Sequence, residues 1–126
     1  MSKQDSTSPL FFTHSADSEY FFEEGCFITE LLNVIDDAEV SIAQARVCPG
    51  DTTKWHAVNG TTERYVIISG EGRVEIGNET PRLMKKFDVV SIPAGVRQRI
   101  SNTGIDDLVF LAICTPRFVK ENYVEL

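Results

Sequence analysis

Short runs of alternating apolar and polar residues recur along the chain, with turn residues between them. The clearest runs cover residues 40–47, 73–77, 88–92, 96–102 and 108–114. Strand side chains alternate with a period of two, and evenly spaced short strands are typical of an all-β sandwich or barrel. No stretch of useful length has the helical period, although the tail has room for one helical turn. We therefore predict an all-β fold.

The two ends of this pattern differ from its middle. The run LVFLAIC at 108–114 is almost continuously apolar, which favours a central strand covered on both faces. Near the other end, Phe27, Ile28 and Thr29 favour a strand within a region rich in aromatic residues. We expect such N-terminal strands to pack outside a barrel or to join the sheet of a second copy.

These differences divide the chain into four segments. We expect a loose polar N-terminus at 1–9, an N-terminal strand extension at 10–37, a barrel at 38–116 and a tail at 117–126. At 126 residues, the chain has room for one domain with a proper core.

The stretch PGDTTKWHAVNGTTERYVIISGEG carries the most informative residues. Asn59-Gly60 between two alternating runs predicts a hairpin with a tight turn. That hairpin would place His56 directly opposite Glu63, with Cβ atoms about 5 Å apart. Tyr65 would share the face of Glu63. An imidazole and a carboxylate at this separation can share a cation or a proton.

Glu63 is the more informative member of this pair. A carboxylate inside a barrel needs a cation, a hydrogen-bond donor or a raised pKa, because burial without a partner is costly. His56 could instead be a barrel-lining imidazole bonded to Glu63, without a metal. Tyr65 could donate a proton to a ligand, or it could be a buried core tyrosine.

Composition excludes several classes of function. The net charge of -7 argues against nucleic acid as a partner, since that binding requires clustered Lys and Arg. No apolar run reaches the roughly 20 residues of a membrane span. The N-terminal residues do not resemble a secretory signal, so we expect a cytoplasmic location without a membrane partner.

The cysteines give no sign of metal or redox chemistry. Cys26, Cys48 and Cys114 are widely spaced and form no CxxC pair. We expect reduced, structural thiols.

Other polar residues sort by strand alternation. Arg97 and Arg99 are expected to point away from the pocket and to form ion pairs at a surface or interface. Trp55 is predicted to pack on the exterior, with Arg64 opposite it across the hairpin. Gln44 and Arg46 share one strand face, and alternation alone leaves open whether that face looks inward.

The spacing of these residues resembles the two motifs of the cupin superfamily of small double-stranded β-helix barrels. The positions that match are Gly50, His56, Glu63 and Gly70 in the first motif, and Pro93, Gly95 and Asn102 in the second. Three positions depart from the pattern. Val58 replaces the second histidine of the first motif, Phe87 replaces the first glycine of the second, and Gln98 replaces the histidine ligand of the second.

The resemblance implies a double-stranded β-helix, or cupin jelly-roll barrel, that binds a small-molecule ligand, and we expect a homodimer. It also implies a mononuclear divalent metal (iron, manganese, nickel or zinc) held by His56, Glu63 and Gln98, with Glu63, His56 and Tyr65 as catalytic candidates. The alternatives are a metal-free His56/Glu63 acid-base pair, as in epimerase-like cupins, and a binding module without catalysis. The ERYV and CTPRF segments also resemble small single-domain cupins, but they imply no particular reaction.

Overall fold

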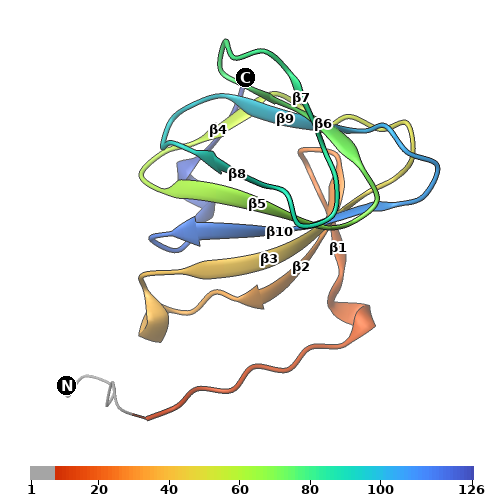
Figure 1. Cartoon of the computed structure of the whole chain (residues 1–126). Coiled ribbons are helices and arrows are strands. Elements are labelled where there is room, and N and C mark those ends of the chain that lie inside the picture. The colour runs from red at the N-terminus through yellow and green to blue at the C-terminus, as the bar shows by residue number, and fades with distance from the viewer. Residues whose placement is uncertain (1–7) are drawn as a thin grey trace.

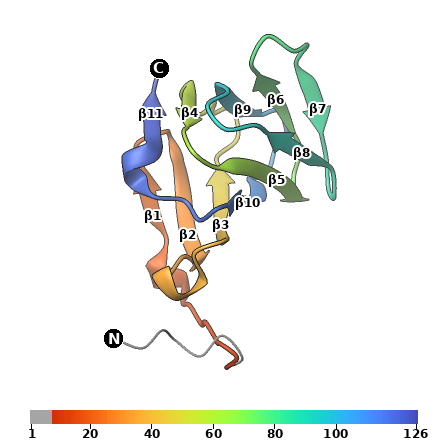
Figure 2. The same ribbon diagram turned by 90° about the vertical axis from the view of Figure 1, so that its left-hand side faces the viewer.

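Two antiparallel sheets form the molecule, and the computed structural model describes residues 8–126 (Figures 1 and 2). The six-stranded sheet has the order β1 (Tyr20–Phe22), β2 (Cys26–Leu32), β3 (Ser41–Val47), β10 (Leu108–Thr115), β5 (Thr62–Ser69), β8 (Val89–Ile92). The five-stranded sheet has the order β11 (Tyr123–Glu125), β4 (His56–Val58), β9 (Gln98–Asn102), β6 (Gly72–Ile76), β7 (Arg82–Met84). Within residues 8–126 the helical elements are three short 3-10 turns, at Ala16–Ser18, Ile35–Asp37 and Lys120–Asn122.

The all-β prediction is confirmed, and most predicted runs are strands. The nearly continuous apolar run is β10, which lies between β3 and β5 as a central strand should. Two short strands, β7 and β11, were not predicted from the sequence. In the described part of the chain, no helix has both the length and the apolar character needed to cross a membrane.

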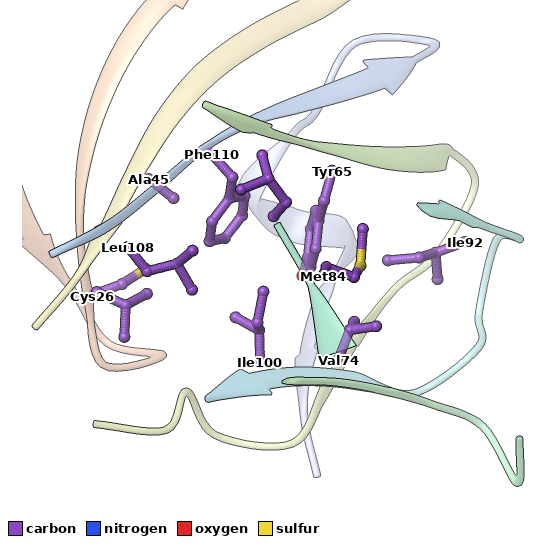
Figure 3. Packing of buried hydrophobic residues seen from close by; sticks show 11 residues of the cluster. Cys26, Ala45, Tyr65, Val74, Met84, Ile92, Ile100, Leu108 and Phe110 are labelled. Carbon is purple, nitrogen blue, oxygen red and sulfur yellow. The ribbon is translucent and has the colours of Figure 1, made fainter. Parts of the chain in front are cut away.

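The core fills the space between the two sheets (Figure 3). Strand alternation provides the core side chains, because every second side chain of β3, β5 and β10 points inward. Tyr65 and Phe110 are the largest side chains of this core, and their ring centroids lie 4.5 Å apart. Their packing partners are Cys26, Ala45, Val47, Ile67, Val74, Met84, Ile92, Ile100 and Leu108.

The hairpin predicted around Asn59-Gly60 is wrong. This turn carries the chain from β4 in one sheet to β5 in the other, so the two strands do not pair. His56 pairs with Gln98, whereas Glu63 pairs with Cys114 and Ile92. The turn is held by other segments, since the Asn59 N–H donates to the Asn122 carbonyl. An Asn-Gly signal predicts a turn, but it does not determine which strands then pair.

The N-terminal strands extend the barrel on one side. β1 and β2 form a hairpin that adds to β3, and β1 is the last strand of its sheet (Figure 2). Residues 8–15 run outside the two sheets. The prediction of a loose segment at 1–9 falls mostly on residues 1–7, which lie outside the described residues.

Two turns show strong backbone constraints. Gly70 has a φ of +80°, and a Cβ atom there would lie 2.6 Å from the Asp107 carbonyl oxygen. Phe87 has a φ of +72° and a side chain that is 72% exposed. The Asp88 N–H donates to the Lys85 carbonyl, so Phe87 occupies the third position of a turn that favours glycine. Phe87 thus has a backbone conformation that glycine adopts more readily.

Candidate functional site

A small cavity of about 60 Å³ opens on the inner face of the six-stranded sheet, beside its N-terminal hairpin. Side chains of β1, β2, β3, β5 and β10 line it. Two of its lining residues, Glu24 and Glu63, carry largely buried carboxyl groups, and 13% of the Glu24 side chain is exposed. The cavity volume corresponds to about four water molecules, so it suits a ligand of a few heavy atoms.

Glu63 enters the cavity from the start of β5. It shares the inward face with Tyr65, as strand alternation predicts. Its Oε1 atom is buried and has no hydrogen-bond partner among the described residues. Burial raises the pKa of Glu63, the charge of Glu24 raises it further, and His56 and Gln98 partly oppose this rise. The carboxyl therefore has an acceptor oxygen to offer to a ligand.

Glu24 is the functional candidate that the sequence analysis missed. It lies in the turn between β1 and β2, and the Lys54 N–H donates to its carbonyl oxygen at 2.7 Å. Burial raises the pKa of Glu24 to about 7, partly offset by the Cys26 thiol, whose sulfur lies 3.5 Å from Oε2. A carboxyl group with this pKa can both give and accept a proton at neutral pH.

His56 stands behind Glu24. Its ring is 1% exposed, and its Nδ1 atom lies 2.7 Å from the Lys54 carbonyl oxygen. Because a carbonyl only accepts, Nδ1 carries the proton in this contact. Nε2 then faces Glu24, with 3.7 Å to its Oε1 atom. Tyr123 stacks on the imidazole at a centroid distance of 5.2 Å and fixes the plane of the ring.

Tyr65 and Gln98 stand behind Glu63. The Tyr65 hydroxyl donates to Gln98 Oε1, and both side chains are buried. This bond leaves the Gln98 amide N–H groups to face the carboxylate side, where they lower the pKa of Glu63. Burial raises the pKa of Tyr65 well above its usual range, and Glu63 adds to the effect. Tyr65 therefore remains protonated and orients Gln98.

The cavity thus contains only part of the predicted site. Glu63 lines it, whereas His56, Tyr65 and Gln98 are absent from its lining and support the two carboxyl groups from behind. The predicted cross-strand contact of His56 with Glu63 is replaced by an approach of His56 to Glu24. The side chains of His56 and Glu63 still point into the same barrel interior.

The donors do not fit the metal site that the resemblance implies. Within residues 8–126, no three His, Cys, Asp or Glu side chains are arranged to hold a metal ion. Gln98 Oε1 already accepts from Tyr65, and His56 Nε2 faces Glu24. We therefore derive no chemical step through an ion held by His56, Glu63 and Gln98.

The predicted exterior residues lie mostly where alternation placed them. Arg99 forms an ion pair with Glu75, at 2.9 Å between Nε and Oε1, so its outward orientation is confirmed. Arg97 and Arg99 both stack on Trp55, at 4.2 and 4.4 Å from the ring centroid. Trp55 is not paired with Arg64, because that pairing required the hairpin.

The face of β3 that carries Gln44 and Arg46 looks outward. Arg46 forms ion pairs with Glu19 and Asp107, at 2.8 and 3.3 Å. The opposite face, with Ala45 and Val47, belongs to the core. The face of Gln44 and Arg46, which strand alternation alone could not assign, is therefore the outer face. Arg46 does not enter the barrel.

The thiols fit a structural role. Cys26 and Cys114 are buried, and all three cysteines are free. Burial raises the pKa of Cys114 to about 12 and moves the pKa of Cys26 upward as well. Neither buried thiol is ionised at neutral pH, so neither is a nucleophile.

Comparison with known proteins decides the family. A family model for the cupin domain matches residues 44–114, which is more than half of the chain. The chain belongs to the cupin family. The double-stranded β-helix predicted from the motifs is therefore confirmed. This cupin is also 31% identical, over 105 residues, to a protein of Methanocaldococcus jannaschii described as uncharacterized, with 82% of this chain and 83% of that protein covered.

Solved cupin-like structures share the fold at low sequence identity. A protein with a double-stranded β-helix domain from Klebsiella pneumoniae has a TM-score of 0.72 at 17% identity, over 90% of this chain and 95% of that chain. Pac13, described as a nucleoside dehydratase, has a TM-score of 0.75 at 15% identity, over 94% and 92%. KdgF from Halomonas sp. has a TM-score of 0.77 at 14% identity, over 90% and 99%. These likenesses concern the fold alone.

One position of the cupin motifs bears on the second ionisable group of the site. Val58, at the position of a motif histidine, is 4% exposed and packs as a buried apolar side chain. This position therefore brings no imidazole into the barrel interior. Glu24, from outside the two motifs, instead supplies the second ionisable group beside His56.

Proposed function

We propose that this cupin is an enzyme that moves a proton on a small polar ligand held in the barrel, without a required metal ion. The observation that carries the proposal is the pair of largely buried carboxyl groups, Glu24 and Glu63, lining one cavity. Both have a raised pKa, and acid-base catalysis is most effective when the pKa lies near the working pH.

The two carboxyl groups suit different halves of a proton transfer next to a carbonyl group. Glu63 has a free Oε1 lone pair and would take the proton from carbon. Protonated Glu24 would give its proton to the carbonyl oxygen, which forms an enediol or enol. Glu63 would then give its proton to the neighbouring carbon of the enediol while Glu24 takes the proton of the other hydroxyl group, which completes an isomerisation and restores both groups.

The residues behind the carboxyl groups would act by positioning. His56, anchored through Nδ1 to a backbone carbonyl, presents Nε2 to Glu24 and can stabilise its proton. Tyr65 holds Gln98, whose amide orients Glu63. In this proposal His56, Glu63, Tyr65 and Gln98 all keep a role in the site. The groups that touch the ligand are the carboxyl groups of Glu24 and Glu63.

The fold supports this kind of chemistry. Pac13 is described as a nucleoside dehydratase, and variants of it are described in complexes with uridine. A barrel of this size can therefore hold a small molecule beside reactive groups. The identity of 15% carries no substrate over to this chain.

Hydrogen exchange with solvent tests the proposal without knowledge of the product. The protein is incubated in D₂O and EDTA with a panel of small sugars, keto acids and amino ketones, and NMR follows deuterium uptake beside the carbonyl group. We expect uptake that falls by about 100-fold or more in Glu63→Gln and Glu24→Gln, while Glu39→Gln, at an exposed position, retains it. Absence of exchange with every compound would refute the proposal.

The same experiment separates the two alternatives. Exchange that appears only when EDTA is omitted and iron, manganese, nickel or zinc is added would support the metal-dependent interpretation with His56 as a ligand. Saturable binding without exchange would support a binding module instead.

We also propose a homodimer. β1 is an edge strand, and its Tyr20 and Phe21 side chains are 44% and 62% exposed. An exposed, aromatic sheet edge can pair with a second chain. Light scattering on the purified chain tests this, with a monomer at micromolar concentration as the contrary result.

A further inference from the structure

The charges around the cavity all have one sign. Its ionisable lining side chains include the glutamates Glu24, Glu30 and Glu63, and no Lys, Arg or His among the described residues lines it. Arg117 donates to the Oδ1 atom of the lining residue Asn33 at 2.8 Å, and Arg46 pairs with Glu19 and Asp107 on the outer face of β3, so neither arginine lines the cavity. An anion that entered would meet carboxyl groups and no cationic side chain among the lining residues.

The cavity also contains an acceptor that lacks a donor. Glu63 Oε1 is buried and is unpartnered by any described residue. Burying a carboxylate oxygen in this way is costly unless a ligand completes its hydrogen bonding. A ligand with an N–H or O–H group would do so, and a positive ligand would gain from both carboxyl groups.

Aromatic rings form a further part of the lining. Tyr20, Phe22 and Phe118 border the same cavity as the glutamates. The faces of aromatic rings attract organic ammonium groups. Acid groups and aromatic rings in one cavity are a combination that favours an amine.

We propose that the ligand of this cavity carries a protonated amine and that the cavity discriminates against carboxylates and other anions. The inference rests on the proposed function in one respect, because Glu63 and Glu24 are the groups that touch the ligand in both. It goes further by naming the charge of the substrate. An ammonium group beside Glu63 would also favour the ionised form of Glu63, which is the form required of a base.

Three probes of equal carbon skeleton test the charge preference. They are 1-amino-2-propanol, 1,2-propanediol and lactate, which differ in an ammonium, a hydroxyl and a carboxylate group. Each is titrated into the full chain in EDTA at neutral pH, and NMR chemical shifts report the affinity. We expect a millimolar dissociation constant for the amine, at least about tenfold tighter than for lactate, with the diol between them.

Variants show whether the carboxyl groups are responsible. Glu63→Gln should weaken binding of the amine by about 10- to 100-fold and leave the diol almost unchanged. Glu39→Gln should change neither, because this residue is exposed and outside the cavity lining. Lactate binding as tightly as the amine, or no shift with the amine up to about 50 mM, would overturn the inference.

A final arm separates organic from inorganic cations. Magnesium, manganese or zinc salts are titrated alone, without EDTA. A divalent ion that binds at micromolar concentration and displaces the amine would also overturn the inference. Selective amine binding without deuterium uptake by any compound would refute the proposed reaction and leave the charge preference intact, so the two failures are distinguishable.

Discussion

Replacing Glu24 with glutamine should stabilise the protein, and the gain should grow with pH. The folded state raises the pKa of this carboxyl from 4.5 to about 7, chiefly through burial. Below the lower value, both folded and unfolded chains are protonated at this residue. As pH rises, the unfolded chain ionises first, so the free energy of unfolding falls until the pH passes the folded value.

The size of the effect follows from the difference between the two pKa values. Each pH unit between them corresponds to about 1.4 kcal/mol, so Glu24 costs the folded state about 3 kcal/mol above neutral pH. Glu24→Gln removes the ionisable group but keeps the shape and an oxygen that can accept from the Cys26 thiol. For a domain of this length, we expect a Tm gain of about 10 °C near pH 8 and little gain near pH 5.

Thermal and urea unfolding of the wild type and Glu24→Gln at these two pH values measure the effect. Glu39→Gln is the matched control, since it makes the same chemical change at an exposed position. A Tm difference that is the same at both pH values would refute the reasoning, because a group ionised in both states contributes nothing to the slope. A loss of stability at both would mean that the Glu24 carboxylate makes favourable contacts.

Three further outcomes are expected. Phe87→Gly should raise the free energy of unfolding by about 1 kcal/mol in urea titrations, because glycine tolerates the φ of +72°; a loss of stability would show that the exposed ring contributes more than the strain. Gly70→Ala should lower it by more than about 2 kcal/mol, because its Cβ would meet the Asp107 carbonyl, and an unchanged urea midpoint would contradict this. Metal analysis of protein purified without added metal should give substoichiometric and equal contents in the wild type, His56→Ala and Glu63→Gln, whereas a stoichiometric ion lost in both variants would restore the metal interpretation.

Strand alternation and motif spacing predicted the barrel. The buried central strand at 108–114, the outward face of Arg99 and the inward face shared by Glu63 and Tyr65 all follow from a period of two. Each of these features depends only on neighbouring residues of one strand, so it can be predicted from the sequence. The β3 face of Arg46 could not be assigned, because alternation gives two faces without saying which one is covered.

The pairing of strands was the part that the sequence could not determine. Asn59-Gly60 predicts a turn equally well within one sheet or between two, and here it joins two. The error carried over to the site, because His56 was placed opposite Glu63 and lies instead at 3.7 Å from Glu24.

Glu24 was missed for the same reason. It comes from the turn of a separate hairpin and reaches His56 only through the folding of β1 and β2 against the barrel. No sequence spacing connects residues brought together in this way. The nearest signal was an acidic residue before Gly25, between two aromatic or apolar clusters, where a tight turn returns the chain to the sheet.

The central claim is that one barrel cavity holds two carboxyl groups that exchange protons near neutral pH. Carbon-13 NMR titration of the assigned Glu24 and Glu63 carboxyl carbons tests it most directly. We predict a midpoint at about 7 for Glu24 and a midpoint above the ordinary glutamate value for Glu63, with each titration perturbed in the variant that lacks the other carboxyl. Two independent midpoints at the ordinary glutamate value would contradict the account.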